Sequence, residues 1–247
     1  IITFVEKRMN IQLQILPLLS VLFLFLVAPV VIILAVSFWD YTEFSLIPDF
    51  VLTNYIEIFE SGVTYSTYLN TFKFAFLGWL FTVIIGFTLA YFLAFHVRTL
   101  RWQIILFLIC TIPFWTSNII RMIAWIPVLG RNGLMNSLLL ELGVISEPLE
   151  WLLYSDFAVI LAFVHLYTLF MLVPIFNSMM RIDKSIIEAA QDMGANSLQI
   201  LINVIVPLCL PGIAIGTIFV VSLIMGDFIT VQAVSYTHLR AHETYTY

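Results

Sequence analysis

Charged side chains are scarce in this 247-residue chain: Asp, Glu, Lys and Arg make up only 10% of it, whereas 62% of the residues are hydrophobic. A mean hydropathy of +1.07 lies well outside the usual balance of a soluble domain, in which about 25% of residues are charged. Cysteine is also rare. Cys110 and Cys209 both fall in apolar runs without C-x-x-C or His/Cys ligand spacing, so we expect both to be small packing residues. The composition is that of an integral membrane protein.

Catalytic and nucleotide-binding motifs are missing as well. The sequence contains no G-x-x-x-x-G-K-[ST] phosphate loop, no H-E-x-x-H and no G-x-S-x-G. His238 and His242 are four residues apart, but they lack that frame and a third ligand nearby. We therefore expect that the chain is not an enzyme, holds no catalytic, cofactor or metal site, and does not hydrolyse ATP itself.

Long uncharged runs predict membrane-spanning helices. Asp, Glu, Lys and Arg are absent from five windows: 9–39, 74–97, 102–120, 157–180 and 193–226. Each window can hold a helix that crosses a hydrocarbon core, which takes about 20 residues. Their continuous Leu, Ile, Phe and Val runs do not alternate as the strands of a transmembrane barrel do. We expect an all-α integral membrane protein with five spans, at about 12–38, 70–95, 102–126, 157–180 and 208–230.

The placement of charge predicts the orientation. Basic residues gather at the N-terminus and in alternate loops: Lys7, Arg8, Arg98, Arg101, Arg181 and Lys184. The two other segments, 40–60 and 127–156, are acidic. The positive-inside rule puts the N-terminus and segment 181–207 in the cytoplasm, and the first span is too long for a cleaved signal peptide. The net charge of −5 then belongs to the outer face, where it would attract cations and not nucleic acid, unless these loops are simply polar.

Segment 181–207 is polar enough to interrupt the membrane-spanning pattern. Asp183 or Ser185 can cap a first short helix, and Gly194 permits a sharp turn before Ser197 starts a second one. The segment contains Glu188-Ala189-Ala190, Gly194 and Val204-Ile205-Val206-Pro207. These residues resemble the EAA loop of ABC importer permeases, whose pattern is E-A-A, three residues, G, nine residues and then I-x-L-P. Val stands here in place of both Ile and Leu of the I-x-L-P ending.

The resemblance extends from about Leu52 to Val234, where the chain is similar to the spermidine/putrescine permease subfamily. The segments that carry it are 52–59, 68–75, P-F-W-T-S-N-I-I-R-M-I-A-W at 113–125, L-G-R-N-G-L-M-N-S-L-L at 129–139, E-P-L-E at 147–150 and M-G-D-F-I-T at 225–230. Family members usually have six spans, so the resemblance implies a type I importer permease fold with five of six helices present. We expect a permease domain over 1–234 and a non-native tail over 235–247.

The resemblance also implies partners and a location. Cytoplasmic ATPase subunits would use ATP and receive the loop through Glu188, Ala189, Ala190, Gly194 and Pro207. A second permease subunit, identical or different, and a periplasmic or extracellular solute-binding protein would complete the importer. The chain would be a multi-pass protein of the bacterial inner membrane, in contact with the lipid bilayer.

Four residues are candidates for the substrate pathway: Trp115, Asn118, Tyr167 and Asp227. Asp227 follows more than 30 residues without a charge, and an ionised carboxylate within a span needs a cation, water or a pore. The alternative is that Asp227 caps a helix at the outer interface. The aromatic and amide groups would suit cation–π or hydrogen-bond contact with a polyamine, but such residues, and His165, are more often interfacial-belt or packing residues. We expect Arg121 to pair with an acidic outer-loop residue or to snorkel.

Other functions stay open at this point. Phosphonates, other organic cations or amino-acid derivatives are alternative cargoes for the same type of permease. An ion-coupled secondary transporter would show broken helices and ionisable groups in repeated halves, and no repeat is evident. A membrane-embedded structural or assembly protein would fit the spans but would not need an EAA loop. The most economical prediction is a permease for a small cationic solute such as spermidine or putrescine.

Overall fold

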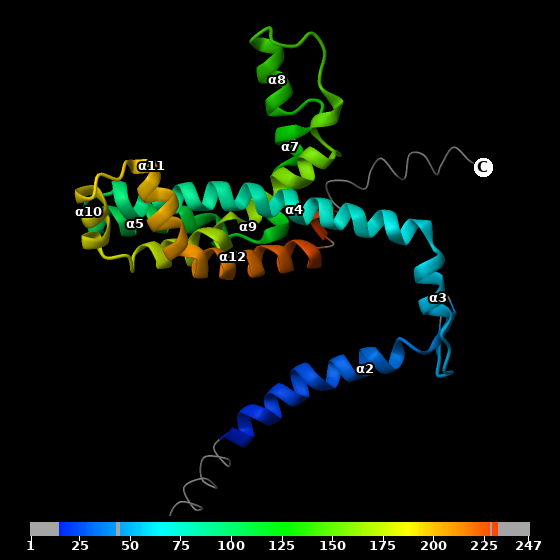
Figure 1. The fold of residues 1–247 in the computed structure, drawn as a ribbon. Helices are drawn as coiled ribbons and strands as arrows, with labels where there is room; N and C mark the ends of the chain where they lie inside the picture. Colours follow the sequence, from blue (N-terminus) through cyan, green and yellow to red (C-terminus); the bar gives the residue numbers. More distant parts are fainter. Residues whose placement is uncertain (1–14, 43–44, 228, 232–247) are drawn as a thin grey trace, which may run out of the picture. The chain divides into compact units, whose positions relative to one another are not determined.

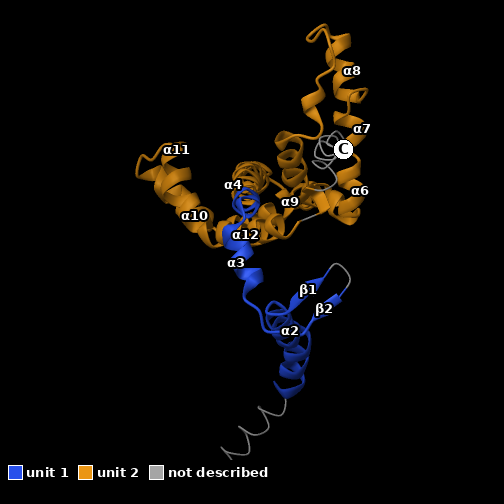
Figure 2. Cartoon of the chain, turned by 90° about the vertical axis from the view of Figure 1, so that its right-hand side faces the viewer, with its two compact units in different colours: residues 1–68 blue, residues 69–247 orange. Residues whose placement is uncertain are grey.

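The computed structural model describes residues 15–42, 45–227 and 229–231. The expected tail at 235–247, with His238 and His242, lies outside the described residues. The chain falls into two compact units, residues 1–68 and 69–247, coloured separately in Figure 2. The expectation of a permease domain over 1–234 stays a prediction.

The first unit is an apolar helix followed by a hairpin and a short helix. The helix runs over Ile15–Val36, with a π-helical turn η1 (Phe23–Val27) before α2 (Ala28–Val36), and its mean hydropathy of 3.1 is the highest of any candidate span. Strands β1 (Asp40–Thr42) and β2 (Ser45–Ile47) pair antiparallel, and α3 covers Thr53–Glu60. The Asn54 amide donates to the carbonyl oxygens of Ser37 (3.2 Å) and Trp39 (2.8 Å). It thus satisfies carbonyl groups just after the end of α2 that have no helical partner.

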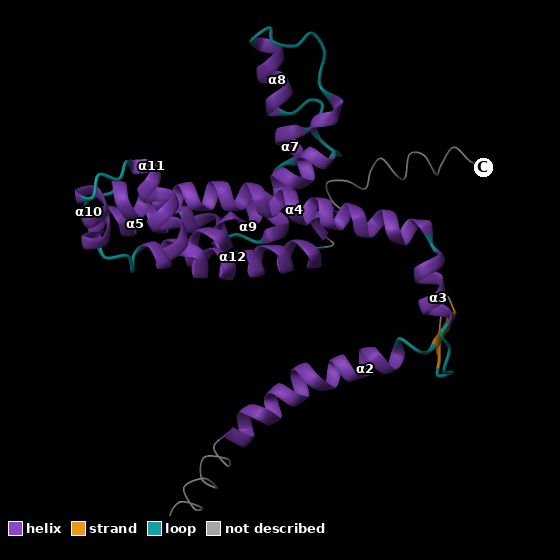
Figure 3. Ribbon diagram, viewed as in Figure 1, coloured by secondary structure: helices purple, strands orange, loops and turns teal. Residues whose placement is uncertain are grey.

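The second unit is built from helices alone among the described residues (Figure 3). Helix α4 (Gly62–Tyr91) begins in the first unit and continues here. The elements that follow are η2 (Phe92–His96), α5 (Leu100–Thr111), η3 (Ile112–Trp115), α6 (Asn118–Ile123), α7 (Ile126–Leu129), α8 (Leu134–Glu141), η4 (Glu150–Leu152), α9 (Asp156–Met179), α10 (Lys184–Asp192), α11 (Ser197–Ile200), η5 (Leu201–Ile205) and α12 (Val206–Gly226).

Helix α9 is the centre of this unit, and α4 and α12 run beside it (Figure 1). Gly212 and Gly216 bring the α12 backbone close to α9: a Cβ atom added at Gly212 would lie 2.5 Å from the carbonyl oxygen of Pro174, and one at Gly216 would lie 3.2 Å from the Cα of Met171. Small residues allow this approach, on which dispersion contacts between membrane helices depend. Trp79 of α4 donates from Nε1 to the Thr217 hydroxyl of α12 at 2.9 Å.

Within the described residues, four helices are long and apolar enough to cross a membrane: Ile15–Val36, Gly62–His96, Asp156–Met179 and Ser197–Gly226. A fifth candidate span is a bent pair, Leu100–Trp115 with Asn118–Glu141. These helices confirm the predicted helical fold with several apolar spans.

The span expected at 102–126 is not one straight helix. Its two parts meet at an angle of 91°. Thr116 donates to the Pro113 carbonyl oxygen from its backbone N–H (3.3 Å) and from its hydroxyl (2.7 Å), which closes the η3 turn. Thr116 and Ser117 then take extended backbone angles. Proline cannot donate the helical hydrogen bond, so the helix ends in a tight turn here.

The close contact at Gly212 is testable by adding one methyl group. Gly212→Ala is expected to lower the free energy of unfolding by about 1–3 kcal/mol, because the new Cβ meets the Pro174 carbonyl and cannot be accommodated by a side-chain rotation. Gly226→Ala at the end of the same helix is the control, since its added Cβ has no atom within 4 Å. Thermal unfolding in detergent measures both variants, and equal midpoints would show that α12 can move away from α9.

Candidate functional site

Segment 181–207 folds as two capped helices, α10 and α11, at one end of the second unit. The Asp183 carboxylate accepts from the Ser185 backbone N–H at 3.0 Å and caps α10. Hydrogen bonds from Ser185 lower the pKa of Asp183 below its usual value, so this cap is fully present at neutral pH and is lost as the pH falls through that lowered pKa. Asn196 and Gln199 form a reciprocal capping box on α11, with both hydrogen bonds at 2.9 Å.

Gly194 ends α10 in a left-handed conformation, with φ of 84°. Its N–H donates to the Gln191 carbonyl (2.8 Å), and the Ala195 N–H donates to the Ala190 carbonyl (3.0 Å), which is the Schellman arrangement. A Cβ added at Gly194 would meet no atom within 4 Å. The space around Gly194 is therefore open, and the penalty for a side chain there comes from the backbone angle.

The other motif residues lie in different environments. Ala190 is buried against the core at 6% exposure, whereas Glu188 and Ala189 are exposed on α10. Pro207 is exposed as the second residue of α12, directly after the π-helical turn η5. Proline has no backbone N–H, and in the first turn of a helix this N–H would have no helical partner, so proline costs little there. The Glu-Ala-Ala motif therefore presents one carboxylate outward while its last alanine anchors the helix.

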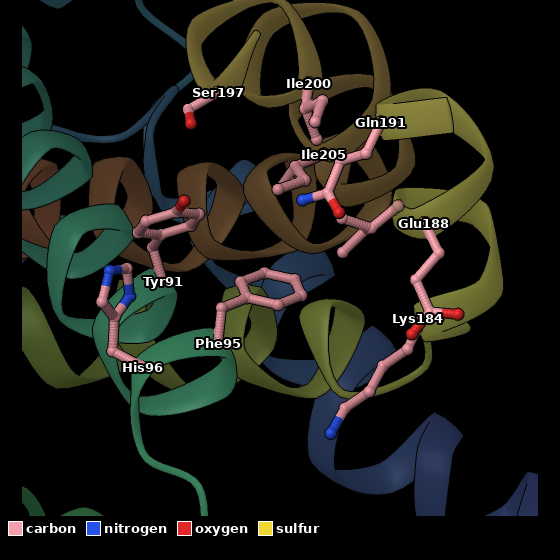
Figure 4. A pocket seen from close by; sticks show the side chains of 10 residues that line it. Tyr91, Phe95, His96, Lys184, Glu188, Gln191, Ser197, Ile200 and Ile205 are labelled. Carbon is pink, nitrogen blue, oxygen red and sulfur yellow. The ribbon is translucent and has the colours of Figure 1, made fainter. Parts of the chain in front are cut away.

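A cavity of about 360 Å³ lies beside Glu188 (Figure 4). Lys184, Glu188 and Gln191 contribute to it from α10, and aromatic rings of α4 and η2 form another part of its wall. Its remaining lining comes from the segment after α10. The lining aromatic and polar residues outside α10 are Tyr91, Phe95, His96 and Ser197.

A second cavity, of about 470 Å³, lies between α6, α9 and the end of α12. It brings together three of the four residues predicted for the substrate pathway: Asn118, Tyr167 and Asp227. Trp115 is 86% exposed and does not line this cavity. The remaining lining is mostly apolar: Ile119, Met122, Ser222, Leu223, Gly226, Ile229 and Thr230.

The Asp227 carboxylate receives three hydrogen bonds. The Tyr167 hydroxyl donates at 2.5 Å, the Thr230 hydroxyl at 2.6 Å and the Thr230 backbone N–H at 2.9 Å. Asp227 thus caps the turn that follows α12 and also lines the cavity. Tyr167 is near the middle of α9, so the carboxylate lies beside the middle of an apolar span. A charge at such a depth is costly unless it is hydrogen-bonded or meets a cation.

Sequence reasoning missed Thr230. The signal was present as D-x-x-T at 227–230, because an N-cap aspartate accepts from the backbone N–H three residues later. The unbroken apolar run before it made residues 225–231 look like the end of a span instead of the start of a new turn.

Arg121 and His165 are held by neutral groups. Arg121 is only 7% exposed; its guanidinium donates to the Asn118 side-chain oxygen, and its Nε has no partner. We expected Arg121 to pair with an acidic outer-loop residue or to snorkel, and within the described residues it forms no ion pair. His165 accepts from Trp125 Nε1 at 3.2 Å, which agrees with the packing interpretation.

Comparison with known proteins gives one family match and several relatives. Residues 86–235 match the family described as binding-protein-dependent transport system inner membrane component. The chain is 34% identical to the spermidine/putrescine transport system permease protein PotB of Escherichia coli (strain K12) over 84% of this chain and 74% of that protein. It is 31% identical to the Haemophilus influenzae protein of the same name, over 85% of this chain and 72% of the relative.

A solved structure has the same fold. It is described as a bacterial ABC transporter involved in the import of the acidic polysaccharide alginate, and it matches with a TM-score of 0.69 at 18% identity. The match covers 90% of this chain and 76% of that one.

The conformation at Gly194 gives a test of the loop. Gly194→Val is expected to destabilise the α10–α11 turn by about 1–2 kcal/mol, because a branched side chain disfavours the left-handed region. Gly194→Asn is the matched control, since asparagine tolerates this region. Hydrogen exchange at Gly194 and Ala195 in detergent should accelerate in the valine variant and stay slow in the asparagine variant; equal protection in both would contradict the role of φ.

Proposed function

Because the chain belongs to the binding-protein-dependent inner-membrane component family of ABC importers, we propose that it is a permease subunit through which a small cationic solute, spermidine or putrescine, passes. The chain is a multi-pass membrane protein and not an enzyme. Importers of this family work with ATPase and substrate-binding subunits, and the identity of these partners is part of our proposal. The observation that carries the cargo assignment is the Asp227 carboxylate on a cavity within the bundle.

The chemistry of the cavity suits an ammonium group. Asp227 supplies a negative charge and Ser222 a hydroxyl group, whereas the side-chain oxygen of Asn118 already accepts from Arg121. An ammonium group that leaves water needs such oxygen atoms, and the apolar remainder of the wall suits the methylene chain of a polyamine. The names of the relatives support the same cargo, because PotB is a spermidine/putrescine permease.

The orientation of the chain in the membrane belongs to the same proposal. Basic residues at the N-terminus and around segment 181–207 support a cytoplasmic location for both. In this orientation, the acidic segments 40–60 and 127–156 are on the side from which a binding protein delivers the cargo, and Asp227 follows the end of α12 that points to that side. Their negative field would raise the local concentration of cations there.

The cargo assignment predicts a specific effect of neutralising one carboxylate. In the complete importer, Asp227→Asn is expected to lower the rate of spermidine uptake about tenfold, because a hydrogen bond or ion pair to a charged group is lost. Glu147→Gln is the matched control: it removes an exposed carboxylate that does not line the cavity. Radiolabelled uptake in proteoliposomes measures both variants at equal amounts of assembled complex.

Uptake unchanged by Asp227→Asn would remove Asp227 from the pathway. Competition for uptake by a phosphonate, an amino-acid derivative or an uncharged solute, but by no polyamine, would overturn the cargo class while leaving the permease assignment intact.

We further propose that α10 docks a cytoplasmic ATPase subunit through Glu188. This carboxylate is exposed beside a cavity of about 360 Å³, and the buried Ala190 and the Gly194 turn support the helix that carries it. Closure of ATPase subunits on ATP would then move the loop and rock the bundle between inward-open and outward-open states.

Two charge-removing variants on one helix test the docking proposal. Glu188→Gln is expected to lower uptake and ATP hydrolysis by the assembled importer about tenfold, because a charge-assisted contact with the partner is lost. Asp192→Asn, one turn further along α10, removes the same charge from a residue that does not line the cavity and should have little effect. An equal loss in both variants would show that the net charge of the loop, and not the Glu188 carboxylate, governs coupling.

A further inference from the structure

The segment between α5 and α9 forms a lobe, residues 118–155, that contains α6, α7 and α8. Asn136 of α8 is its internal clamp: this side chain is fully buried, donates to the carbonyl oxygens of Gly130 (3.0 Å) and Leu149 (3.1 Å), and accepts from the Leu149 N–H (2.8 Å). These bonds hold the returning segment 142–152 against one face of α8. Three satisfied bonds to a buried amide make this arrangement specific.

The opposite face of α8 is uncovered and carries exposed leucines, with Glu141 at its C-terminal end. Leu134 and Leu138 lie two residues before and after Asn136, which places both on the far side of the helix from it. Leu134 is 72% exposed, Leu138 is 52% exposed, and Leu142 at the end of the helix is 67% exposed. A four-residue spacing puts these three leucines in one stripe. Nothing in the described part of the chain covers this stripe.

The direction of the lobe follows from the bend before it. Asn118–Glu141 runs at 91° to Leu100–Trp115, so the lobe crosses the direction of the span that leads into it. Figure 1 shows α8 on the side of the lobe nearer the α10–α11 end of the bundle, and segment 142–152 returning on the opposite side. Because Asn136 faces this returning segment, the leucine stripe faces back along the bundle, beside the spans.

The level of the lobe is set by its junction with α9. Trp151, 57% exposed, packs edge-to-face on Phe157 in the first turn of α9, with ring centroids 5.8 Å apart. A tryptophan just before a span is typical of the interface between hydrocarbon and headgroups. The lobe is therefore at the level where a bilayer around α9 would end.

We propose that α8 lies in the lipid interface of the leaflet opposite the 181–207 loop, with the leucine stripe in contact with acyl chains. A helix in the plane of the membrane, with one apolar face, binds by burying that face at the boundary between headgroups and acyl chains. A soluble binding protein would approach the lobe from the other side, where segment 142–152 covers α8. Spans continue from both ends of the lobe, which keeps the stripe at this level without a separate anchor. The assignment does not depend on the cargo.

Site-specific quenching tests the lipid contact. The natural thiols are removed by Cys110→Ala and Cys209→Ala, and a fluorophore is attached at Leu138→Cys in the full chain, in nanodiscs with and without its partner subunits. Ser146→Cys on the returning segment is the matched control, because Ser146 is exposed on the covered side of α8. Lipids with brominated acyl chains and aqueous iodide are the two quenchers.

The label at Leu138 should be quenched about twofold or more by brominated lipid and little by iodide, whereas the label at Ser146 should show the reverse. Leu134→Cys, one turn earlier, reports on the same stripe if the Leu138 variant does not insert. Quenching of both stripe labels by iodide alone would overturn the proposal in favour of a water-exposed face. Protection of both from either quencher would overturn it in favour of a protein partner covering α8.

Discussion

The close approach of α12 to α9 is the contact on which the rest of the second unit depends. At Gly212 and Gly216 the α12 backbone lies against Pro174 and Met171 with no room for a Cβ atom. The same two helices are joined at one end by the loop that carries Glu188, and the end of α12 places Asp227 against Tyr167 of α9. Both candidate sites therefore take their positions from a single packed pair. In a membrane, where burial of apolar surface does not drive helices together, this precision comes from backbone proximity at small residues.

The carboxylate of Asp227 shows how a charge is accommodated beside an apolar span. The carboxylate accepts three hydrogen bonds, one from Tyr167 and two from Thr230. It also lines a largely apolar cavity. Hydrogen bonds reduce the cost of removing the charge from water but do not neutralise it. A cationic ligand would therefore meet a carboxylate that is already oriented by hydrogen bonds and still carries its negative charge. Arg121, held nearby only by the Asn118 amide, shows that the bundle interior also tolerates a cation without a carboxylate partner.

Sequence reasoning was most successful where the controlling interactions are local. The Asp183 cap, the Gly194 turn and the start of α11 near Ser197 each depend on residues within one helical turn, and helix-capping rules describe such interactions well. The pairing of Tyr167 with Asp227 joins residues 60 positions apart, so their sequence identified both as candidates but could not place them in contact. The right-angle bend after Trp115 was missed because an apolar run looks the same whether the helix continues or turns. Trp115 was grouped with Asp227 by its residue type, and that bend leaves it exposed away from the cavity.

Irregular helical turns adjoin the Glu188 cavity on two sides. Tyr91 ends α4 where the π-helical turn η2 begins, with Phe95 and His96 inside that turn, and Ile205 ends another π-helical turn, η5. Such turns have wider hydrogen-bonded rings than an α-helix and are frequent at functional sites. The α12 side of the cavity thus connects to the α9–α12 pair through η5, and the α4 side connects to the bundle through η2. Along the chain, the η5 turn therefore lies between the loop that carries Glu188 and the closely packed Gly212 and Gly216 of α12.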